Sequence, residues 1–447
     1  MEEEISLELK IRQTVEKFLE LSRDKKTTVI SHFDADGISS AAIMIQALRK
    51  LDIKFSLKII KRLDKEFLQT LNEDNIILFV DLASGNLDDI AKTNLKEVFI
   101  IDHHEISQEI PNNVTIINPQ LHDKQKISAS GLAYLFCREI DKKNKHLAKL
   151  AIIGMIGDVL DKEIDKLNHE ILTDGEIQKR RGLLVYPSTR PLNMALEFSS
   201  NPFIPGVTGN SEGVLELLRC SGINQENGKY KSLLELKEEE MERLVTTITL
   251  QNPQIKSEDI VGEIFLIKLF NKLEDAREIC AKINACSRYG EPETAIQMCM
   301  EIPNAKKRAD SIHIKYKQSL IEGIRTIVGL EKIKGDGFVI INAQDKIKDT
   351  MIGTVTSIIS NSPNYARGTI IFSMAHDHEN SSKIKVSARC VGKEGRNIRE
   401  VLSRVINVIG GEIGGHEFAA GCTFEKEKEE EFIKEIKKNF EIEMIKI

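Results

Sequence analysis

The chain has 447 residues, of which 41% are hydrophobic and 30% are charged, and its formal net charge is −6. A chain of this length usually folds into more than one domain, and the negative charge excludes a protein that is basic over its whole surface. The longest apolar stretch is too short to span a bilayer and no secretion signal is evident, so we expect a cytoplasmic protein without membrane contact. The seven cysteines form no CxxC pair, which predicts reduced, mostly buried thiols.

The first 185 residues alternate between short apolar, β-branched runs and helical patterns. After an amphipathic helix, the pattern predicts strands at 27–31, 53–60, 76–80, 97–101 and 114–118, and helices at 37–51 and 144–158. Such alternation is typical of an α/β domain with a mainly parallel sheet and crossover helices. Ligands of such a sheet bind outside the carboxyl ends of its strands.

The rest of the chain differs in pattern. Residues 186–330 begin with a segment rich in Pro and Gly and continue with charged helical patterns at 274–290 and 305–330, which predict a loop-rich and helical connector. The stretch 331–337, EKIKGDG, resembles a linker. Residues 331–447 alternate strands and helices again and end in a charged helix, which predicts a second, smaller mixed α/β domain.

Polar side chains of one kind follow several of the predicted strands. They are His32, Asp34 and Asp36 after the first strand, Asp81 after the third, Asp102, His103 and His104 after the fourth, and Asp158 at the end of a helix. Asp34 or Asp81 alone is compatible with a helix cap or a turn, and His103 alone with a partly buried core histidine, but a parallel sheet would bring all of these side chains to one edge together. Carboxylates and imidazoles without thiolates suit Mn²⁺ or Mg²⁺, and two such ions can activate water against a phosphoester. The set therefore predicts metal-dependent phosphoester hydrolysis.

The same residues carry a family resemblance. HFDADG, VDLASG, IDHH and IGD, in this order, resemble the motifs of the DHH phosphoesterase superfamily, and GGHEFAAG resembles the signature of its companion DHHA1 domain. The resemblance implies a DHH metal-binding catalytic domain at 1–185 and a DHHA1 substrate-binding domain at 331–447, with an interdomain cleft between them.

The resemblance also implies roles for individual residues. Two divalent ions, preferably Mn²⁺ with Mg²⁺ as an alternative, would be held by His32, Asp34 and Asp81 and by Asp36, Asp81, His103 and Asp158. Asp81 would bridge them, His104 would face the scissile phosphate, and Asp102 would orient a ligating imidazole.

A second group of residues is expected to bind substrate. Arg389, His416 and the backbone around Gly414 and Gly415 resemble the family's phosphate and nucleotide grip, because glycines let backbone N–H groups approach an anion. Lys385 lies in the same basic segment. Asn284 and Arg288 are expected at the cleft, although INACSRYG also reads as a plain helix ending at Gly290.

Within the superfamily, the segments at 188–209 and 283–296 resemble the archaeal RecJ-like nucleases. This implies an exonuclease that degrades single-stranded DNA or RNA to mononucleotides in DNA replication or repair, since a narrow cleft admits one strand and excludes a duplex. The alternatives are an oligoribonuclease or cyclic-dinucleotide phosphodiesterase, a phosphatase of small phosphomonoesters, and a replication or repair scaffold. By resemblance, the expected protein partners are the GINS complex or the Hef helicase/nuclease.

Overall fold

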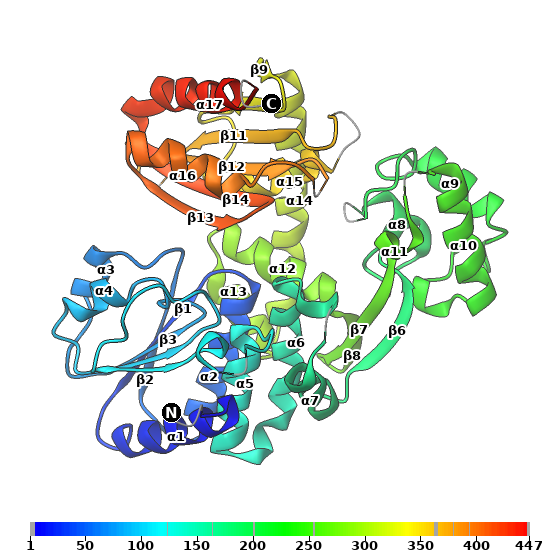
Figure 1. Cartoon of the computed structure of the whole chain (residues 1–447). Helices are drawn as coiled ribbons and strands as arrows, with labels where there is room; N and C mark the ends of the chain where they lie inside the picture. The colour runs from blue at the N-terminus through cyan, green and yellow to red at the C-terminus, as the bar shows by residue number, and fades with distance from the viewer. Residues whose placement is uncertain are drawn as a thin grey trace. The chain divides into compact units, whose positions relative to one another are not determined.

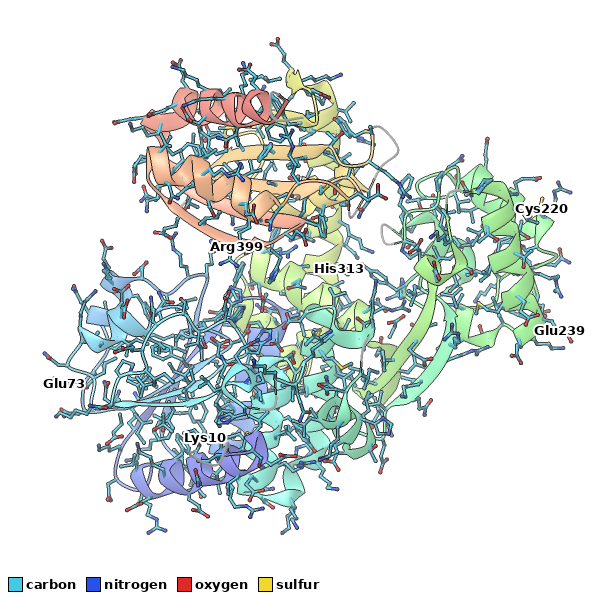
Figure 2. All side chains as sticks on the ribbon, viewed as in Figure 1. Lys10, Glu73, Cys220, Glu239, His313 and Arg399 are labelled. Atoms are coloured by element: carbon cyan, nitrogen blue, oxygen red, sulfur yellow. The ribbon has the colours of Figure 1, made fainter. Side chains whose placement is uncertain are left out.

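The computed structural model describes residues 5–122, 124–162, 164–199, 202–253, 255–361, 365–378, 380–392 and 394–444 (Figure 1). The chain divides into two compact units, residues 1–313 and 314–447. Among the described residues, no helix is long and apolar enough to cross a membrane. All seven cysteines are free; six are buried, and Cys220 is exposed on helix α9 (Figure 2).

The first unit is built on a five-stranded, fully parallel sheet with the order β2–β1–β3–β4–β5. Its strands are β1 (Thr27–His32), β2 (Phe55–Ile60), β3 (Ile76–Val80), β4 (Glu97–Ile101) and β5 (Val114–Ile117). The predicted parallel α/β domain is thereby confirmed. In this strand order the direction of winding reverses between β1 and β3, which is where such sheets bind their ligands.

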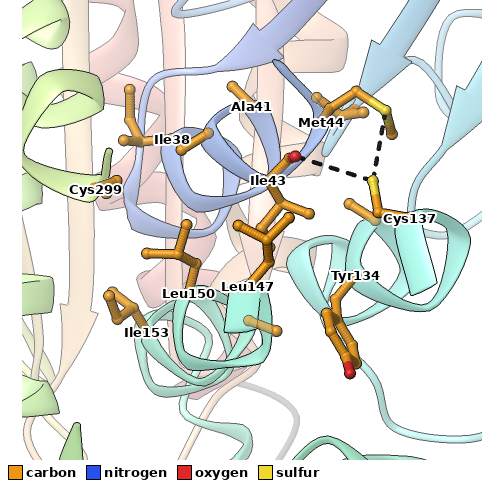
Figure 3. Close-up of a cluster of buried hydrophobic side chains, with 14 of the residues drawn as sticks. Ile38, Ala41, Ile43, Met44, Tyr134, Cys137, Leu147, Leu150, Ile153 and Cys299 are labelled. Carbon is orange, nitrogen blue, oxygen red and sulfur yellow. Dashed lines mark hydrogen bonds between the residues drawn. The ribbon is translucent and has the colours of Figure 1, made fainter. Parts of the chain in front are cut away.

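Helices cover both faces of this sheet. Residues of β3 alternate between two hydrophobic clusters, because successive strand side chains point to opposite faces. One cluster includes helices α1 (Leu7–Leu21), α2 (Ala35–Lys50), α5 (Ala129–Ile140) and α6 (Ala148–Gly157), and the other includes α3 (Lys65–Gln69) and α4 (Leu87–Ala91). Figure 3 shows the contact between α2, α5 and α6, with Ile38, Leu150 and Ile153 packed in its interior. The buried helix predicted up to Asp158 is α6, for which Asp158 is the C-cap.

The remainder of the first unit contains strands that the sequence pattern did not predict. An antiparallel sheet, β6–β7–β8, lies in or next to the stretch expected to be loops and helices. In chain order, the helices and strands of this part of the chain are α7 (Lys166–Asp174), β6 (Gln178–Leu183), α8 (Leu192–Glu197), α9 (Ser211–Cys220), α10 (Glu238–Gln251), α11 (Ser257–Ile260), β7 (Val261–Leu269) and β8 (Lys272–Asp275). The predicted helices then follow as α12 (Ala276–Arg288), α13 (Pro292–Cys299) and α14 (Ala305–Gly329).

The second unit has a mixed six-stranded sheet with the order β13–β14–β12–β11–β10–β9. Its elements are β9 (Lys332–Gly335), β10 (Phe338–Asn342), α15 (Asp349–Ser360), β11 (Ile370–His376), β12 (Lys383–Cys390), α16 (Ile398–Ile409), β13 (Glu412–His416), β14 (Ala419–Glu425) and α17 (Glu429–Met444). The predicted mixed α/β domain is confirmed. The expected linker at 331–337 is wrong, because Lys332–Gly335 pairs with β10 as an edge strand.

Candidate metal centre

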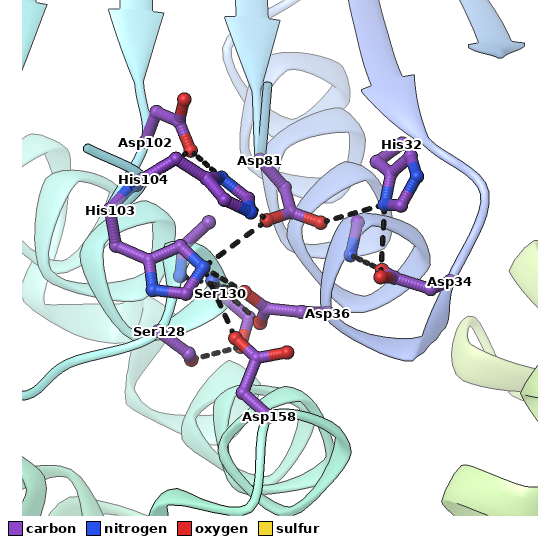
Figure 4. Close-up of polar contacts among 12 residues, drawn as sticks. His32, Asp34, Asp36, Asp81, Asp102, His103, His104, Ser128, Ser130 and Asp158 are labelled. Atoms are coloured by element: carbon purple, nitrogen blue, oxygen red, sulfur yellow. Dashed lines mark hydrogen bonds and ion pairs between the residues drawn. The ribbon is translucent and has the colours of Figure 1, made fainter. Parts of the chain in front are cut away.

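The candidate ligands lie together at the carboxyl ends of β1, β3 and β4 and at the end of α6 (Figure 4). His32 is the last residue of β1, Asp81 follows β3, and Asp102 follows β4. These positions bring residues far apart in the sequence to one edge of the sheet, as the strand-end argument predicted.

A first group of three ligand-type side chains is formed by His32, Asp34 and Asp81. One ligand atom from each lies within 4.8 Å of the others. Nδ1 of His32 is 2.9 Å from Oδ2 of Asp34 and 3.5 Å from Oδ2 of Asp81. The other oxygen of Asp34 accepts a hydrogen bond of 3.0 Å from the backbone N–H of Gly37 and caps α2. The helix cap considered from the sequence therefore exists, and it leaves one carboxylate oxygen for the group.

A second group is formed by Asp36, His103 and Asp158, again with ligand atoms within 4.8 Å of one another. Nε2 of His103 lies 3.2 Å from Oδ2 of Asp158 and 3.9 Å from Oδ2 of Asp36. Asp36 is fully buried. Its two oxygens accept hydrogen bonds from the backbone N–H groups of Ala129 (2.8 Å) and Ser130 (3.0 Å) at the start of α5, where a helix end favours negative charge.

Asp81 connects the two groups. Its Oδ2 faces His32, whereas its Oδ1 lies 3.6 Å from Nε2 of His103. The side chain is only 2% exposed. Its backbone φ is +61°, a left-handed conformation that non-glycine residues rarely adopt and that often marks functional sites. The strained backbone places one carboxylate between two sets of ligand atoms.

The electrostatics of the cluster show a deficit of positive charge. Burial, together with the nearby charges of Asp34 and Asp36, raises the pKa of Asp81 well above its ordinary range. Burial and the charge of Asp36 likewise raise the pKa of Asp158. Burial lowers the pKa of His32, but the nearby carboxylates of Asp34 and Asp81 outweigh it and raise that pKa well above normal. The raised pKa values mean that His32, Asp81 and Asp158 hold protons tightly, at the position where a metal cation would bind.

Unpaired buried atoms provide a test of whether a metal fits. Nδ1 of His32, Oδ2 of Asp81 and Oδ2 of Asp158 are buried and have no hydrogen-bond partner among the described residues. Buried polar atoms are normally paired, and these three belong to the two groups of ligand atoms. Oxygen and imidazole ligands without thiolate are a set that Mn²⁺ and Mg²⁺ accept. The residues present therefore fit divalent metal ions.

Asp102 orients His104 rather than the ring of His103. Oδ1 of the buried Asp102 lies 2.7 Å from Nδ1 of His104, and its two oxygens accept from the backbone N–H groups of Ser84 (3.0 Å) and His103 (2.8 Å). The hydrogen bond with Asp102 raises the pKa of His104. The His104 side chain is 55% exposed. The sequence predicted that Asp102 orients a metal-ligating imidazole, whereas the structure places it against the exposed ring of His104, which is not one of the predicted ligands.

Several supporting residues escaped the sequence interpretation. The side chain of Asn118 donates to the backbone oxygen of His104 (2.9 Å) and to Oγ of Ser84 (3.0 Å). Asn118 directly follows β5, so the rule that located Asp81 and Asp102 would have found it as well. Ser130 binds Asp36 through its backbone N–H, and Gly154 on α6 lies close to the Asp36 carboxylate. The sequence contains no signal for either residue, because both contacts depend on how α5 and α6 pack against Asp36.

Asn284 and Arg288 lie on α12, which ends at Arg288, with Gly290 at φ +85° two residues later. The plain-helix interpretation of INACSRYG is therefore correct for the backbone. Nδ2 of Asn284 donates to Sγ of Cys280 over 3.6 Å. Burial raises the pKa of Cys280 to about 12, with further contributions from Asp34 and Asp158 that indicate its proximity to the centre. One face of α12 thus borders the centre, and the substrate roles of Asn284 and Arg288 stay predictions.

The other expected substrate residues lie in the second unit. Pairing of β12, β14 and β13 places Arg389, Ala419 and His416 in one row across the sheet. Lys385 shares a sheet face with Arg389 because the two are four residues apart on one strand. Nε of Arg389 donates to Oγ of Ser357 on α15 (2.9 Å), and its Nη1 donates to the backbone oxygen of Ala388 (2.8 Å). The guanidinium is thereby held in place.

The two adjacent glycines of this row differ. Gly415 has a φ of +117°, and a β-carbon there would collide with Ala420 of the paired strand. A β-carbon at Gly414 would meet no atom within 4 Å. Gly415 is required by the backbone, whereas the space beside Gly414 is open to a ligand.

Basic residues that are close in sequence to Arg389 do not share its face. The guanidinium of Arg396 stacks over Phe440 of α17 at 4.2 Å from the ring centre. Phe440 belongs to the hydrophobic cluster on the face opposite to Ser357 and α15. Arg399 is exposed on α16 (Figure 2). The basic segment is therefore distributed over different surfaces.

Comparisons with known proteins agree with this geometry. The chain matches the DHH family N-terminal domain at residues 26–155, the DHH-CID domain at 186–257 and the DHHA1 domain at 336–441. It is 28% identical over 427 residues to an uncharacterized protein of Methanocaldococcus jannaschii, covering 91% of both chains. It is 24% identical over 155 residues to the single-stranded-DNA-specific exonuclease RecJ of Bacillus subtilis, covering 31% of this chain and 20% of that protein.

Solved structures show the same fold. RecJ of Thermus thermophilus in complex with Mn²⁺ is similar with a TM-score of 0.60 and 18% identity, covering 96% of this chain and 54% of that one. This chain thus spans about half the length of the Thermus protein. CDC45 of Entamoeba histolytica is similar with a TM-score of 0.66 and 11% identity, covering 96% and 98%. The chain therefore belongs to the DHH phosphoesterase superfamily as a RecJ-like member with DHH, DHH-CID and DHHA1 domains.

Proposed function

We propose that the chain is a metal-dependent phosphodiesterase that degrades single-stranded DNA or RNA from an end and releases mononucleotides, in DNA replication or repair. The observation that carries the proposal is the position of Asp81, whose two oxygens face the two groups of ligand atoms separately. One carboxylate between two such groups is able to bridge a pair of divalent ions.

The metal roles follow from these groups. His32, Asp34 and Asp81 would hold one ion, and Asp36, Asp81, His103 and Asp158 would hold the other, with Mn²⁺ preferred and Mg²⁺ as an alternative. When bound, two such ions make a water molecule nucleophilic at neutral pH and stabilise the oxygens of an in-line phosphoryl displacement.

His104 is proposed to contact the scissile phosphate. Asp102 fixes the ring through Nδ1 and raises its pKa, which favours the cationic imidazolium. The half-exposed ring can therefore present a second N–H donor and a positive charge to a phosphate oxygen. Asp102 acts through His104 and is a positioning residue.

Substrate binding is assigned to the second unit. Arg389, Lys385 and His416, with the open backbone at Gly414, are proposed to bind backbone phosphates of a single strand. The sequence has no Trp and six Tyr, so few aromatic rings are available for base stacking. Phosphate contacts would then dominate, and affinity should fall with salt.

The proposal is tested by digestion of single-stranded DNA and RNA labelled at either end, with Mn²⁺ and with chelator. We expect Mn²⁺-dependent release of mononucleotides from a thirty-nucleotide strand and no cleavage of duplex. Cleavage restricted to two-nucleotide substrates would instead indicate an oligoribonuclease or cyclic-dinucleotide phosphodiesterase. Binding of single strands without any cleavage would indicate a scaffold. Co-purification with GINS or Hef would test the proposed partners.

A further inference from the structure

A cavity of about 410 Å³ lies in the first unit, away from the candidate metal centre. It is lined by the last turn of α2, including Arg49 and Lys50, and by His146 and Leu147 just before α6. Helix α2 begins beside Asp34 and has 16 residues, which corresponds to roughly 24 Å at 1.5 Å per residue. The cavity and the metal centre therefore occupy opposite ends of the same packed helices, whose contact is shown in Figure 3.

One wall of the cavity is cationic. Nζ of Lys50 is fixed by Oδ2 of Asp141 (2.6 Å) and by Oδ1 of the buried Asn144 (3.2 Å). Within the described chain, the guanidinium of Arg49 forms no hydrogen bond or ion pair. Nδ1 of His146 lies 3.0 Å from the backbone oxygen of Lys143, which leaves its Nε2 for a ligand. None of the described residues that line the cavity is an Asp or Glu. Such a wall matches a phosphate group.

The rest of the lining has a different character. Met300 and Ile302 provide the accessible apolar surface, because Ile302 is 38% exposed whereas Leu147 is buried with 1% exposed. The amide of Gln46 also lines the cavity; its Nε2 donates to the backbone oxygen of Ala42 (2.9 Å), which leaves its Oε1 as an acceptor. Apolar surface with one or two oriented polar groups is what binds the ring of a small molecule, and the volume lies within the usual range of about 300 to 1,000 Å³ for such sites.

We propose that this cavity binds a nucleoside monophosphate. Arg49, Lys50 and His146 would contact the phosphate, Met300 and Ile302 would contact the base and ribose, and Gln46 would accept a hydrogen bond from the base. The site is separate from the metal centre and does not depend on the proposed nuclease activity.

The test is calorimetric titration of adenosine monophosphate into the full chain in the presence of chelator, so that no metal ion contributes. We expect binding to the unmodified protein, about tenfold weaker binding to the double variant Arg49→Gln/Lys50→Gln, and weaker binding of adenosine and of ribose 5-phosphate than of adenosine monophosphate. The variant Arg23→Gln/Lys26→Gln removes the same charge from exposed positions outside the cavity and should bind normally. Asp81→Asn should also bind normally.

Several results would overturn the proposal. These are no binding to the unmodified protein, equal binding by the Arg49 and Lys50 variant, and loss of binding in Asp81→Asn alone, which would place the ligand at the metal centre. Ribose 5-phosphate binding as tightly as adenosine monophosphate would exclude a nucleoside ligand. A measurement without any substitution is the NMR signal of the His146 ring, which should shift on addition of adenosine monophosphate and would stay unchanged if the cavity is empty.

Discussion

A β-carbon added at Gly154 would collide with Oδ1 of Asp36. Helix α6 therefore passes the candidate metal centre at a distance that only a glycine allows, and the same β-carbon would also collide with Oγ of Ser130. The backbone N–H groups of Ala129 and Ser130 donate hydrogen bonds to both oxygens of Asp36, and these bonds restrict the movement of its side chain.

Gly154→Ala should displace Asp36 and weaken metal binding. Overpacking at such a site costs about 1 to 3 kcal/mol of unfolding free energy, so both denaturant stability and Mn²⁺ affinity should fall. Gly329→Ala is a suitable control, because its β-carbon would meet no atom within 4 Å. Unchanged Mn²⁺ affinity in Gly154→Ala would contradict the assignment of Asp36.

Asp81→Asn should remove both metal sites without unfolding the protein. Burial and neighbouring carboxylates already raise the pKa of Asp81, so a neutral amide relieves repulsion in the metal-free chain. Without metal, the melting temperature of the variant should equal or exceed that of the unmodified protein. Addition of Mn²⁺ should no longer raise it. Turnover should fall by more than ~100-fold, which is the upper range for loss of an outer-shell partner of a metal.

The matched control for this variant is Asp88→Asn, at an exposed position on α4. It should keep the Mn²⁺-induced rise in melting temperature. If Asp81→Asn retained metal-stimulated cleavage, the bridging role would be wrong.

The stability of the metal-free protein should decrease as the pH rises above neutrality. The pKa values of His32, His103 and His104 are raised in the folded state: for His32 and His103 nearby carboxylates outweigh the lowering effect of burial, and for His104 the hydrogen bond with Asp102 is the main cause. Groups of this kind stabilise the fold fully below their unfolded value of about 6.5 and lose that contribution as the pH passes their folded pKa.

Metal binding should show the opposite trend, because a metal ion displaces these protons. Mn²⁺ affinity should increase between about pH 6.5 and about pH 8.5, and calorimetry in buffers of different ionisation enthalpy should detect proton release. Affinity that is constant with pH would show that the ion binds elsewhere.

Asp102→Asn should lower turnover by about 10- to 100-fold with metal binding intact, because the orientation and raised pKa of His104 depend on this carboxylate. The alkaline limb of the pH–rate profile should move to lower pH, since a neutral amide no longer stabilises the imidazolium. A uniform loss of rate at every pH would indicate a merely structural role.

Arg389→Ala should weaken binding of single strands about tenfold or more, the usual effect of losing a charged hydrogen bond, with the Mn²⁺-induced stabilisation unchanged. The salt dependence of binding should become shallower. Arg325→Ala, at an exposed position of α14, serves as the control. An unchanged Michaelis constant with undiminished rate would count against the proposed grip.

The sequence was sufficient to predict the parallel sheet because its strands are short runs dominated by apolar and β-branched residues, most continuously in β3, IILFV. It was insufficient for the antiparallel sheet, since β6 reads QKRRGL and becomes a strand through pairing with β7, more than seventy residues later. Likewise, Lys332–Gly335 has the composition of a linker and is ordered by its partner β10. Strands that form through pairing with a partner strand, distant for β6 and adjacent for β9, carry little local signal.

The candidate centre was predictable to the level of residues but not of atoms. Strand ends in a parallel sheet share one edge, which was enough to group Asp81 with His32 and His103. The contacts of the two Asp81 oxygens with His32 and with His103 depend on the folded positions of β1, β3 and β4, and the fixation of Asp36 follows from the position of α5. Neither feature has a signature in the sequence.

The shared carboxylate of Asp81 also bears on how this protein can evolve. On the proposed assignment, a single codon change at Asp81 would disable both halves of the centre at once, whereas changes at His32 or Asp158 would each spare one half. On the proposed function, one substitution at Asp81 would therefore be enough to produce a descendant that binds nucleic acid without cleaving it.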